Sequence, residues 1–265
     1  MRTVSILNLK GGVAKTFTAV NMAYELYRRG FKVLMVDNDK QGNLSRAYGR
    51  YDAESVAPVS RILSGDWRAA VELIQHTDYE GLDILTANMS LMGATWQLTA
   101  EEAGNQIDRF KQFMEHADWV SGYYDYCIID NPPDIGLNVV NALAVTDEVI
   151  VPVKIDEWAL DGLDVLAEQI EDAKQINPRL CLRGILITAY QNTDGEAAGK
   201  EWLERQKMEA YRTGQPYYSI LGVIRYSRKV AESTFNFKPI YEYSPCCGAA
   251  QDYKKFVTQY TGKAR

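Results

Sequence analysis

Hydrophobic residues recur along this chain in short, nearly continuous runs, separated by longer stretches with helical spacing. Seven of these runs are rich in β-branched residues and read TVSILNL, KVLMVD, LDILTA, YCIID, EVIVPV, LRGILITA and ILGVI. Continuous apolar runs of this length are typical of strands that are covered on both faces of a sheet. We therefore expect these segments to form a mostly parallel sheet.

Four of the intervening stretches have the periodicity of amphipathic helices, at residues 16–29, 100–117, 159–175 and 195–212. In the first, Val20, Ala23 and Tyr27 share one stripe, and Gly30 follows the last residue. The alternation of strands and helices predicts an α/β fold, a twisted parallel sheet with helices on both faces and ligands beyond the carboxyl ends of its strands. Without a repeat or a low-complexity linker, we expect one domain over residues 1–265.

The composition agrees with an α/β fold and limits where in the cell the protein can be. The 265 residues, 46% hydrophobic and 24% charged, are enough to bury a full core. No run of about 18 apolar residues occurs, and the N-terminus resembles a strand more than a signal peptide, so we expect a cytoplasmic protein without a membrane partner. His76 and His116 belong to no ligand pattern. The cysteines lack paired zinc-site spacing and are expected to be small buried thiols: Cys127, Cys181, Cys246 and Cys247.

The net charge of -6 conceals an uneven distribution. From Arg205 to the C-terminus the chain has eleven Lys and Arg but four Asp and Glu, so its last part, about 205–265, is basic and the rest is acidic. Such a basic region is either a solvated surface or a face that binds a polyanion. Both interpretations remain open on charge alone.

The segment NLKGGVAKTF, Asn8–Phe17, has the context of a phosphate-binding loop because it joins the first predicted strand to the first predicted helix. Gly11 and Gly12 permit close backbone approach, Lys15 can reach the β- and γ-phosphates, and the Thr16 hydroxyl can bind Mg²⁺. Lys10 is not needed for the chain's own nucleotide and can reach across an interface.

This segment resembles the deviant Walker A loop of the ParA/MinD family, which belongs to the SIMIBI class of P-loop NTPases. KGGVAKT matches the family pattern K-G-G-x-[GA]-K-[ST]. Phe17 departs from it, since the family usually has a second hydroxyl residue there that contacts the α-phosphate. We expect nucleotide binding to persist, weakened by about 0.5–1.5 kcal/mol, the net contribution of one hydrogen bond.

Two further segments carry the resemblance. VDNDKQGNLS is similar to the family's V-D-x-D-P-Q-G-N and places Asp39 where the family has the carboxylate that positions the attacking water, with Lys40 in place of Pro. YDYCIIDNPPDIGLN resembles the Walker B strand and the following switch, with Asp130 suited to hold Mg²⁺ through water and Pro132 beside the γ-phosphate. The metal-side residues implied are Thr16, Asp39 and Asp130.

The resemblance extends to the C-terminal region and indicates the ParA/Soj branch. Arg225 and Tyr226 occupy the place of a Pro-Arg pair that lies near adenine in the family. The last residues lack the apolar moment of the membrane-binding helix of MinD-like members. The switch lacks the cluster cysteine of nitrogenase iron proteins. The cofactor-binding set implied is Lys10, Gly11, Gly12, Val13, Ala14, Lys15, Thr16, Phe17, Asp130, Pro132, Arg225 and Tyr226.

Membership of that branch implies an ATP- and Mg²⁺-dependent ATPase with weak intrinsic activity that partitions DNA. Two subunits would close into a homodimer in which Lys10, Lys15 and Asp39 are catalytic, Lys10 acting on the partner's nucleotide. The dimer would bind DNA without sequence preference and associate with the nucleoid, and a ParB-like centromere-binding protein would stimulate hydrolysis. The expected DNA-binding residues are Arg225, Arg228, Lys229, Lys238, Lys254 and Lys255. Two alternatives are an ATPase that positions a protein cargo without DNA and a P-loop ligase or synthetase of metabolism.

Overall fold

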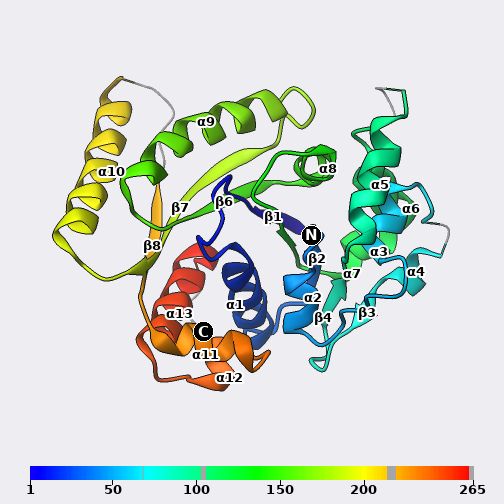
Figure 1. Cartoon of the computed structure of the whole chain (residues 1–265), viewed down its shortest axis with the longest axis horizontal. Helices are drawn as coiled ribbons and strands as arrows, with labels where there is room; N and C mark the ends of the chain where they lie inside the picture. The colour runs from blue at the N-terminus through cyan, green and yellow to red at the C-terminus, as the bar shows by residue number, and fades with distance from the viewer. Residues whose placement is uncertain (68, 103–105, 214–218, 263–265) are drawn as a thin grey trace.

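The computed structural model describes residues 1–67, 69–102, 106–213 and 219–262 (Figure 1). Its strands are ordered β3-β4-β2-β5-β1-β6-β7-β8 in one sheet. Every neighbouring pair is parallel except β3 with β4. The strands are β1 Arg2–Ile6, β2 Val33–Asp37, β3 Gln75–His76, β4 Leu82–Leu85, β5 Tyr126–Asp130, β6 Glu148–Val153, β7 Cys181–Tyr190 and β8 Ile220–Arg225.

Helices connect the strands and cover both faces of the sheet, as Figure 1 shows. The N-terminal half contains α1 Lys15–Arg28, α2 Asn43–Ala47, α3 Pro58–Leu63, α4 Ala70–Leu73, α5 Ser90–Thr99, α6 Arg109–His116 and α7 Asp118–Tyr123. The rest contains α8 Leu137–Val145, α9 Glu157–Ala173, α10 Asp194–Thr213, α11 Arg228–Phe235, α12 Ile240–Tyr243 and α13 Gly248–Thr261. The predicted α/β fold is confirmed.

Successive strand residues alternate between two buried layers, which explains why the strands are apolar throughout. Ile128 and Ile150 pack in a cluster with residues of α1 and α13. Their neighbours point to the other face, where Ile129 joins a cluster with α3, α5 and α6, and Val151 one with α8 and α9. All seven predicted strands are confirmed.

Two predictions from the sequence are wrong in part. The periodic stretch 100–117 is not one helix, because α5 ends at Thr99 and α6 begins at Arg109, and residues 103–105 lie outside the described ranges. Of the four cysteines, Cys127 is buried as expected, but Cys181 and Cys246 are exposed and Cys247 is partly exposed. Cys181 is exposed because it begins β7 at the solvent-facing end of the strand, where apolar neighbours in sequence do not ensure cover.

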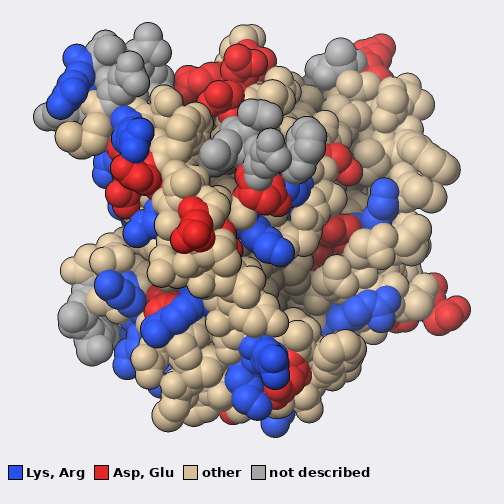
Figure 2. Space-filling view, turned by 60° about the vertical axis from the view of Figure 1, so that its left-hand side comes forward, with Lys and Arg blue, Asp and Glu red and all other residues tan. Residues whose placement is uncertain are grey.

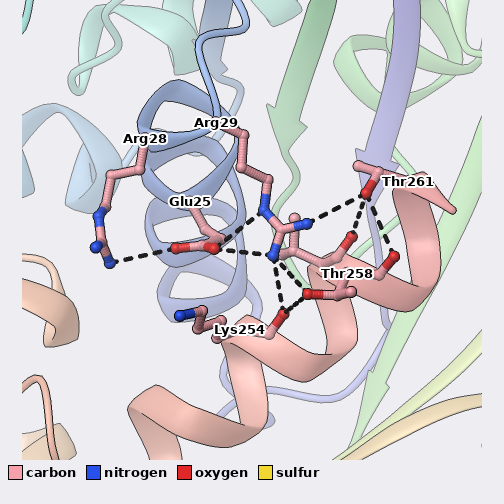
Figure 3. A network of polar contacts seen from close by, with 7 residues as sticks. Glu25, Arg28, Arg29, Lys254, Thr258 and Thr261 are labelled. Carbon is pink, nitrogen blue, oxygen red and sulfur yellow. Dashed lines mark hydrogen bonds and ion pairs between the residues drawn. The ribbon is translucent and has the colours of Figure 1, made fainter. Parts of the chain in front are cut away.

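A nearly buried ion pair at the C-terminal end of α1 also hydrogen-bonds to α13 (Figure 3). The side chains of Arg29 and Glu25 are only 7% and 4% exposed, and Arg29 Nη2 lies 2.9 Å from Glu25 Oε1. The same guanidinium donates to the Thr258 hydroxyl at 2.6 Å and to the carbonyl of Lys254 at 3.2 Å. A buried charge of this kind is tolerated only when its partners remain in place. The C-terminal helix is thereby fixed to the helix that follows the Asn8–Phe17 loop.

Candidate functional site

A cavity of about 420 Å³ opens at the carboxyl ends of β1, β2 and β5. Crossing connections leave a crevice at this edge of a parallel sheet, where α/β proteins commonly bind ligands. Its lining combines the loops after β1, β2 and β5 with residues of α1 and α2, the end of α11 and the segment that follows α11. The lining residues are Gly11, Gly12, Ala14, Lys15, Thr16, Phe17, Val20, Asp39, Asn43, Arg46, Ala47, Pro133, Ser233, Thr234, Phe237 and Lys238.

The loop after β1 is fixed at both ends. The Asn8 side chain donates to the carbonyl of Pro152 at 2.7 Å and accepts from the backbone N–H of Lys10 at 2.9 Å. Near its other end, the Thr188 hydroxyl donates to the carbonyl of Val13 at 3.1 Å. Gly11 and Gly12 are exposed between these points, and an added Cβ would meet no atom within 4 Å at either. The loop therefore presents open backbone N–H groups at the start of α1, a geometry that suits an anion.

Lys15 places an ammonium group inside this loop. Its side chain is buried, and Nζ donates to the carbonyl of Lys10 at 2.9 Å. Burial lowers the pKa of Lys15, while the nearby carboxylates, led by Asp130, favour its charged form. A partly desolvated cation at a helix N-terminus is well suited to bind phosphate oxygens.

Lys10 points away from the cavity and contacts a different element. Its Nζ lies 2.5 Å from Asp156, the residue that precedes α9. Both side chains are more than a third exposed, so solvent screens the pair and its net contribution is about 0.2–1 kcal/mol. The amine can therefore be transferred to another anion at little cost.

Two buried carboxylates lie side by side beneath the cavity. Asp37 and Asp130 end neighbouring strands and face each other in the parallel register of β2 and β5. Asp37 accepts hydrogen bonds from the backbone N–H and the hydroxyl of Ser45, at 2.8 and 2.7 Å. Burial nevertheless raises the pKa of Asp37 to about 7. Asp37 is a site residue that the sequence analysis did not identify, although its position at the end of a predicted strand was a usable signal.

Asp130 is the least satisfied of the buried acids. Among the described residues, neither of its carboxylate oxygens has a hydrogen-bond partner. Burial and the neighbouring Asp37 raise its pKa well above the usual range. A buried carboxylate without donors is a natural place for a cation to bind, directly or through water.

The donor set fits Mg²⁺ held jointly with a phosphate ligand. In the described part of the chain, no group of three or more His, Cys, Asp or Glu side chains is arranged to hold a metal ion. Mg²⁺ usually takes only one or two protein ligands and completes its shell with water and phosphate oxygens. The Thr16 hydroxyl, on the cavity wall, and the Asp130 carboxylate provide that number.

Asp39 and the residues after it form the opposite wall. Asp39 is half-buried, lines the cavity and accepts from the backbone N–H of Gln41 at 3.0 Å. Pro133 lines the same cavity, whereas Pro132 faces a second cavity with Lys40 and Asp134. The predicted Pro132 contact with nucleotide thus stays a prediction.

Phe17 has a structural role in this site. It is buried between the cavity and α13, where its ring packs edge-to-face on Tyr253 at 5.7 Å between centroids. The Tyr253 hydroxyl shares a 2.9 Å hydrogen bond with Thr18. The aromatic residue therefore replaces a hydroxyl on the cavity wall with an apolar contact that anchors α1 to α13.

Arg225 and Tyr226 are not among the cavity-lining residues. Arg225 is exposed and donates through both its backbone N–H and its guanidinium to Asp252, at 2.8–3.0 Å. Tyr226 is 54% exposed. The segment from Ser233 to Lys238 lies at this cavity, and the predicted contact of Arg225 and Tyr226 with adenine stays a prediction.

The six residues expected to bind DNA are exposed, but they are not equally available. Arg225 is paired with Asp252 and Lys229 with Glu232, whereas Lys238 lines the cavity. Lys254 and Lys255 lie on the outer side of α13. On the face of the molecule drawn in Figure 2, basic side chains lie in the lower half and are interspersed with acidic ones. Their common role in DNA binding stays a prediction.

None of the helices in the described ranges combines the length and the apolarity needed to cross a bilayer.

Comparison with known proteins agrees with the geometry. Residues 1–182 match the family described as AAA domain. The chain is 31% identical over 268 residues to the chromosome partitioning protein ParA of Caulobacter vibrioides, covering 100% of this chain and 96% of the relative. It is 33% identical to the sporulation initiation inhibitor protein Soj of Bacillus subtilis, covering 95% of each.

Solved structures share the fold and carry nucleotides. A Mycobacterium smegmatis protein described as cobyrinic acid a,c-diamide synthase, with an ATP analogue and magnesium, has a TM-score of 0.76 at 27% identity and covers 99% of this chain and 97% of its own. The ATP complex of a single-residue variant of Cyanothece McdA has a TM-score of 0.81 at 19% identity, with 100% and 98% covered. The loop, the paired strand-end carboxylates and these similarities over the whole chain agree, and the chain belongs to the ParA/MinD family of P-loop ATPases in the SIMIBI class.

Proposed function

We propose that this protein is an ATP-dependent partition ATPase whose ATP-bound dimer binds DNA without sequence preference. The observation that carries this proposal is the loop with two lysines, in which Lys15 faces the cavity and Lys10 faces outward. One lysine is enough to hold a nucleotide in a single subunit, so an outward lysine at the same loop favours a site completed by a second subunit. Similarity to ParA and Soj over 95% or more of the chain supports partition as the purpose.

The residues of the cavity can be assigned to the steps of ATP hydrolysis. The backbone of Gly11 and Gly12 and the ammonium of Lys15 bind the phosphates. Thr16 and Asp130 would hold Mg²⁺, which would offset the negative charge of the triphosphate. Asp39, which also lines the cavity, would orient the water that attacks the γ-phosphate.

Lys10 completes the site in the proposed dimer. Dimer closure would exchange the screened contact with Asp156 for a charge-assisted bond to the partner's triphosphate in a drier environment, where such a bond is worth more. This exchange makes the closed dimer depend on ATP. Hydrolysis, stimulated by a ParB-like partner, would then return Lys10 to Asp156.

The proposed DNA contact uses the exposed basic residues of α11 and α13. No sequence-reading element is needed, because phosphate contacts alone give non-specific binding that weakens steeply with salt. Arg228, Lys254 and Lys255 are the strongest candidates, since no ion pair to any of them is found in the described part of the chain and none of them lines the cavity.

Each of the two alternative functions is supported by one observation. The acidic side chains interspersed among the basic ones in Figure 2 favour an ATPase that positions a protein cargo without DNA, because they would repel phosphates. The neighbour described as a diamide synthase favours an ATP-consuming synthetase. A synthetase would need a pocket for a second substrate beside the γ-phosphate. The second cavity, near Pro132 and Asp134, is the place where such a substrate would bind.

Filter binding of DNA across a salt series, with ATP, ADP or no nucleotide, tests the proposal. We expect retention only with ATP, and a Lys254→Ala/Lys255→Ala variant should flatten the slope of log K against log salt by about 0.9 for each phosphate contact removed. A Lys111→Ala/Lys174→Ala variant loses the same charge away from α11 and α13 and serves as the matched control. Hydrolysis of ATP without DNA retention would favour cargo positioning, and hydrolysis only with a small-molecule acceptor would favour a synthetase.

A further inference from the structure

Three buried asparagines connect the loop after β2 with the loop after β5, and both loops contribute residues to the cavity. Asn38 lies between Asp37 and Asp39, Asn131 follows Asp130, and Asn138 is in the first turn of α8. They are 0%, 1% and 7% exposed. Burying amides without hydrogen bonds is costly, so a cluster of three at one point needs a structural or functional reason.

Asn38 is held from several directions at once. Its side-chain amide donates to Asn131 Oδ1 at 2.9 Å and to the carbonyl of Asn138 at 3.1 Å. The Asn138 side chain donates back to the carbonyl of Asn38 at 3.0 Å. The backbone N–H of Asn38 donates to the carbonyl of Asp130 at 2.9 Å. The backbone N–H and the backbone carbonyl of Asn38, the residue before Asp39, are therefore both hydrogen-bonded to the segment 130–138.

Asn131 and Asn138, which both hydrogen-bond to Asn38, lie on either side of the loop 132–136. Asn131 is itself held to β1, where its backbone N–H and its side chain donate to the carbonyl of Ile6 at 3.2 and 3.3 Å. At the other end of the loop, a Cβ on Gly136 would lie 2.8 Å from Asn138 Oδ1, which leaves no room for a side chain there. The 132–136 loop therefore adjoins, at each end, a residue that hydrogen-bonds to Asn38.

We propose that Asn38, with Asn131 and Asn138, forms an amide bridge that moves Asp39 together with the 132–136 loop. Asn38 is a positioning residue: it is not among the residues that line the cavity and acts by placing the Asp39 carboxylate. Asn38 Oδ1 has no hydrogen-bond partner among the described residues. It can therefore accept a new hydrogen bond when the loop rearranges. The inference depends on the proposed ATPase function for its kinetic effect, but the mechanical link is independent of it.

Asn38→Leu and Asn138→Leu, singly and together, test the bridge. Asn177→Leu is the matched control, because Asn177 is also buried and donates to two carbonyls, of Leu143 and Thr146, at the far end of α8. We expect Asn38→Leu to lower kcat by about tenfold or more, as for a misplaced catalytic group, with the Kd of a non-hydrolysable ATP analogue changed by less than about threefold. The double variant should be no slower than the slower single variant, since each breaks the same link.

Hydrogen exchange of the nucleotide-free protein supplies a readout that does not depend on hydrolysis. In Asn38→Leu, the backbone amides of both 38–42 and 134–136 should exchange faster than in the wild type, whereas Asn177→Leu should leave both unchanged. Unchanged kcat in a folded Asn38→Leu, or an equal loss in Asn177→Leu, would overturn the inference. If the wild type hydrolyses no ATP, the proposed function fails, and exchange confined to one loop in Asn38→Leu would overturn the bridge separately.

Discussion

At the scale of single residues, Ala14 sits where backbone geometry and side chain conflict. It lies at the N-terminus of α1 with φ of 66° and ψ of 35°, in the left-handed region. The nearby Gly12 has φ of +72°, which glycine adopts without cost. A residue with a Cβ pays about 1–2 kcal/mol in this conformation, so the turn that opens the phosphate side of the cavity holds strain at Ala14.

Ala14→Gly should therefore stabilise the protein. We expect the free energy of unfolding to rise by about 0.5–1 kcal/mol, because relief of the left-handed strain exceeds the entropy that glycine adds to the unfolded chain. Urea denaturation measures this, and Gly12→Ala is the opposite control, expected to lose a similar amount. A lower unfolding free energy in Ala14→Gly would mean that the Ala14 methyl group has a packing role that outweighs its strain.

Asp37 predicts how stability depends on pH. Its pKa in the fold is about 7, above the ordinary value of about 4, so between these two pH values the folded state binds more protons than the unfolded state. The stability from this group is present at low pH and is lost as pH rises through about 7. Denaturation of the nucleotide-free protein in chelator, at pH 5 and pH 7.5, should show a smaller loss of unfolding free energy in Asp37→Asn than in the wild type. Equal losses in the two proteins would contradict the assignment to Asp37.

At the scale of elements, the connection between α1 and α13 explains how the C-terminal helix is coupled to the nucleotide-binding loop. Phe17 packs on Tyr253 at one end of α1, and Arg29 binds α13 at the other end (Figure 3). Both contacts are buried, and they lie on opposite ends of the same helix. Helix α13, which presents Lys254 and Lys255, is therefore held at both ends of the helix that follows the Asn8–Phe17 loop.

Arg29→Met should be strongly destabilising. It leaves the Glu25 carboxylate buried without its main partner, and loss of one member of a buried pair costs about 3–5 kcal/mol. Arg28→Met is the matched control, since Arg28 pairs with the same Glu25 at 3.4 Å from a side chain that is 46% exposed, and such a pair contributes about 1 kcal/mol or less. Thermal and urea denaturation compare the two, and adding Glu25→Gln should recover part of the Arg29→Met loss. Similar small losses in both single variants would show that α13 is not held by this pair.

The sequence predicted the helices and strands well where the hydrophobic pattern was long. It did not predict those elements whose conformation is decided by tertiary contacts. The seven apolar runs are all strands because burial on both faces leaves a strong local signal. The two-residue β3 and the break between α5 and α6 have no such signal. In the site, the loop residues were identifiable from their spacing, but Asp37, Thr188 and the three asparagines act through partners that are distant in sequence. The cavity wall at Ser233–Lys238 was not predicted, because the path of the chain after β8 is set by contacts with α1, such as the bond from the Ile240 N–H to Asn21, and not by a motif.

In the whole molecule, the proposed mechanism of ATP hydrolysis depends on where Lys10 acts. In the single subunit it contacts Asp156, more than a third exposed and apart from the residues that line the cavity. The proposed dimer moves this amine to the partner's triphosphate, so each complete site would contain Asp39 from one subunit and Lys10 from the other. Homodimers with two-fold symmetry would then have two such sites that form together.

Mixing two inactive variants tests this arrangement most directly. Lys10→Ala and Asp39→Ala should each hydrolyse ATP at a small fraction of the wild-type rate, since every site in either homodimer lacks one residue. In an equimolar mixture about half of the dimers pair the two variants, and each of these has one complete site if Lys10 acts across the interface. We predict a steady-state ATPase rate in the mixture of about a quarter of the wild-type rate at the same total concentration. A mixture no more active than the separate variants, while light scattering shows that the two form dimers with ATP, would contradict the account.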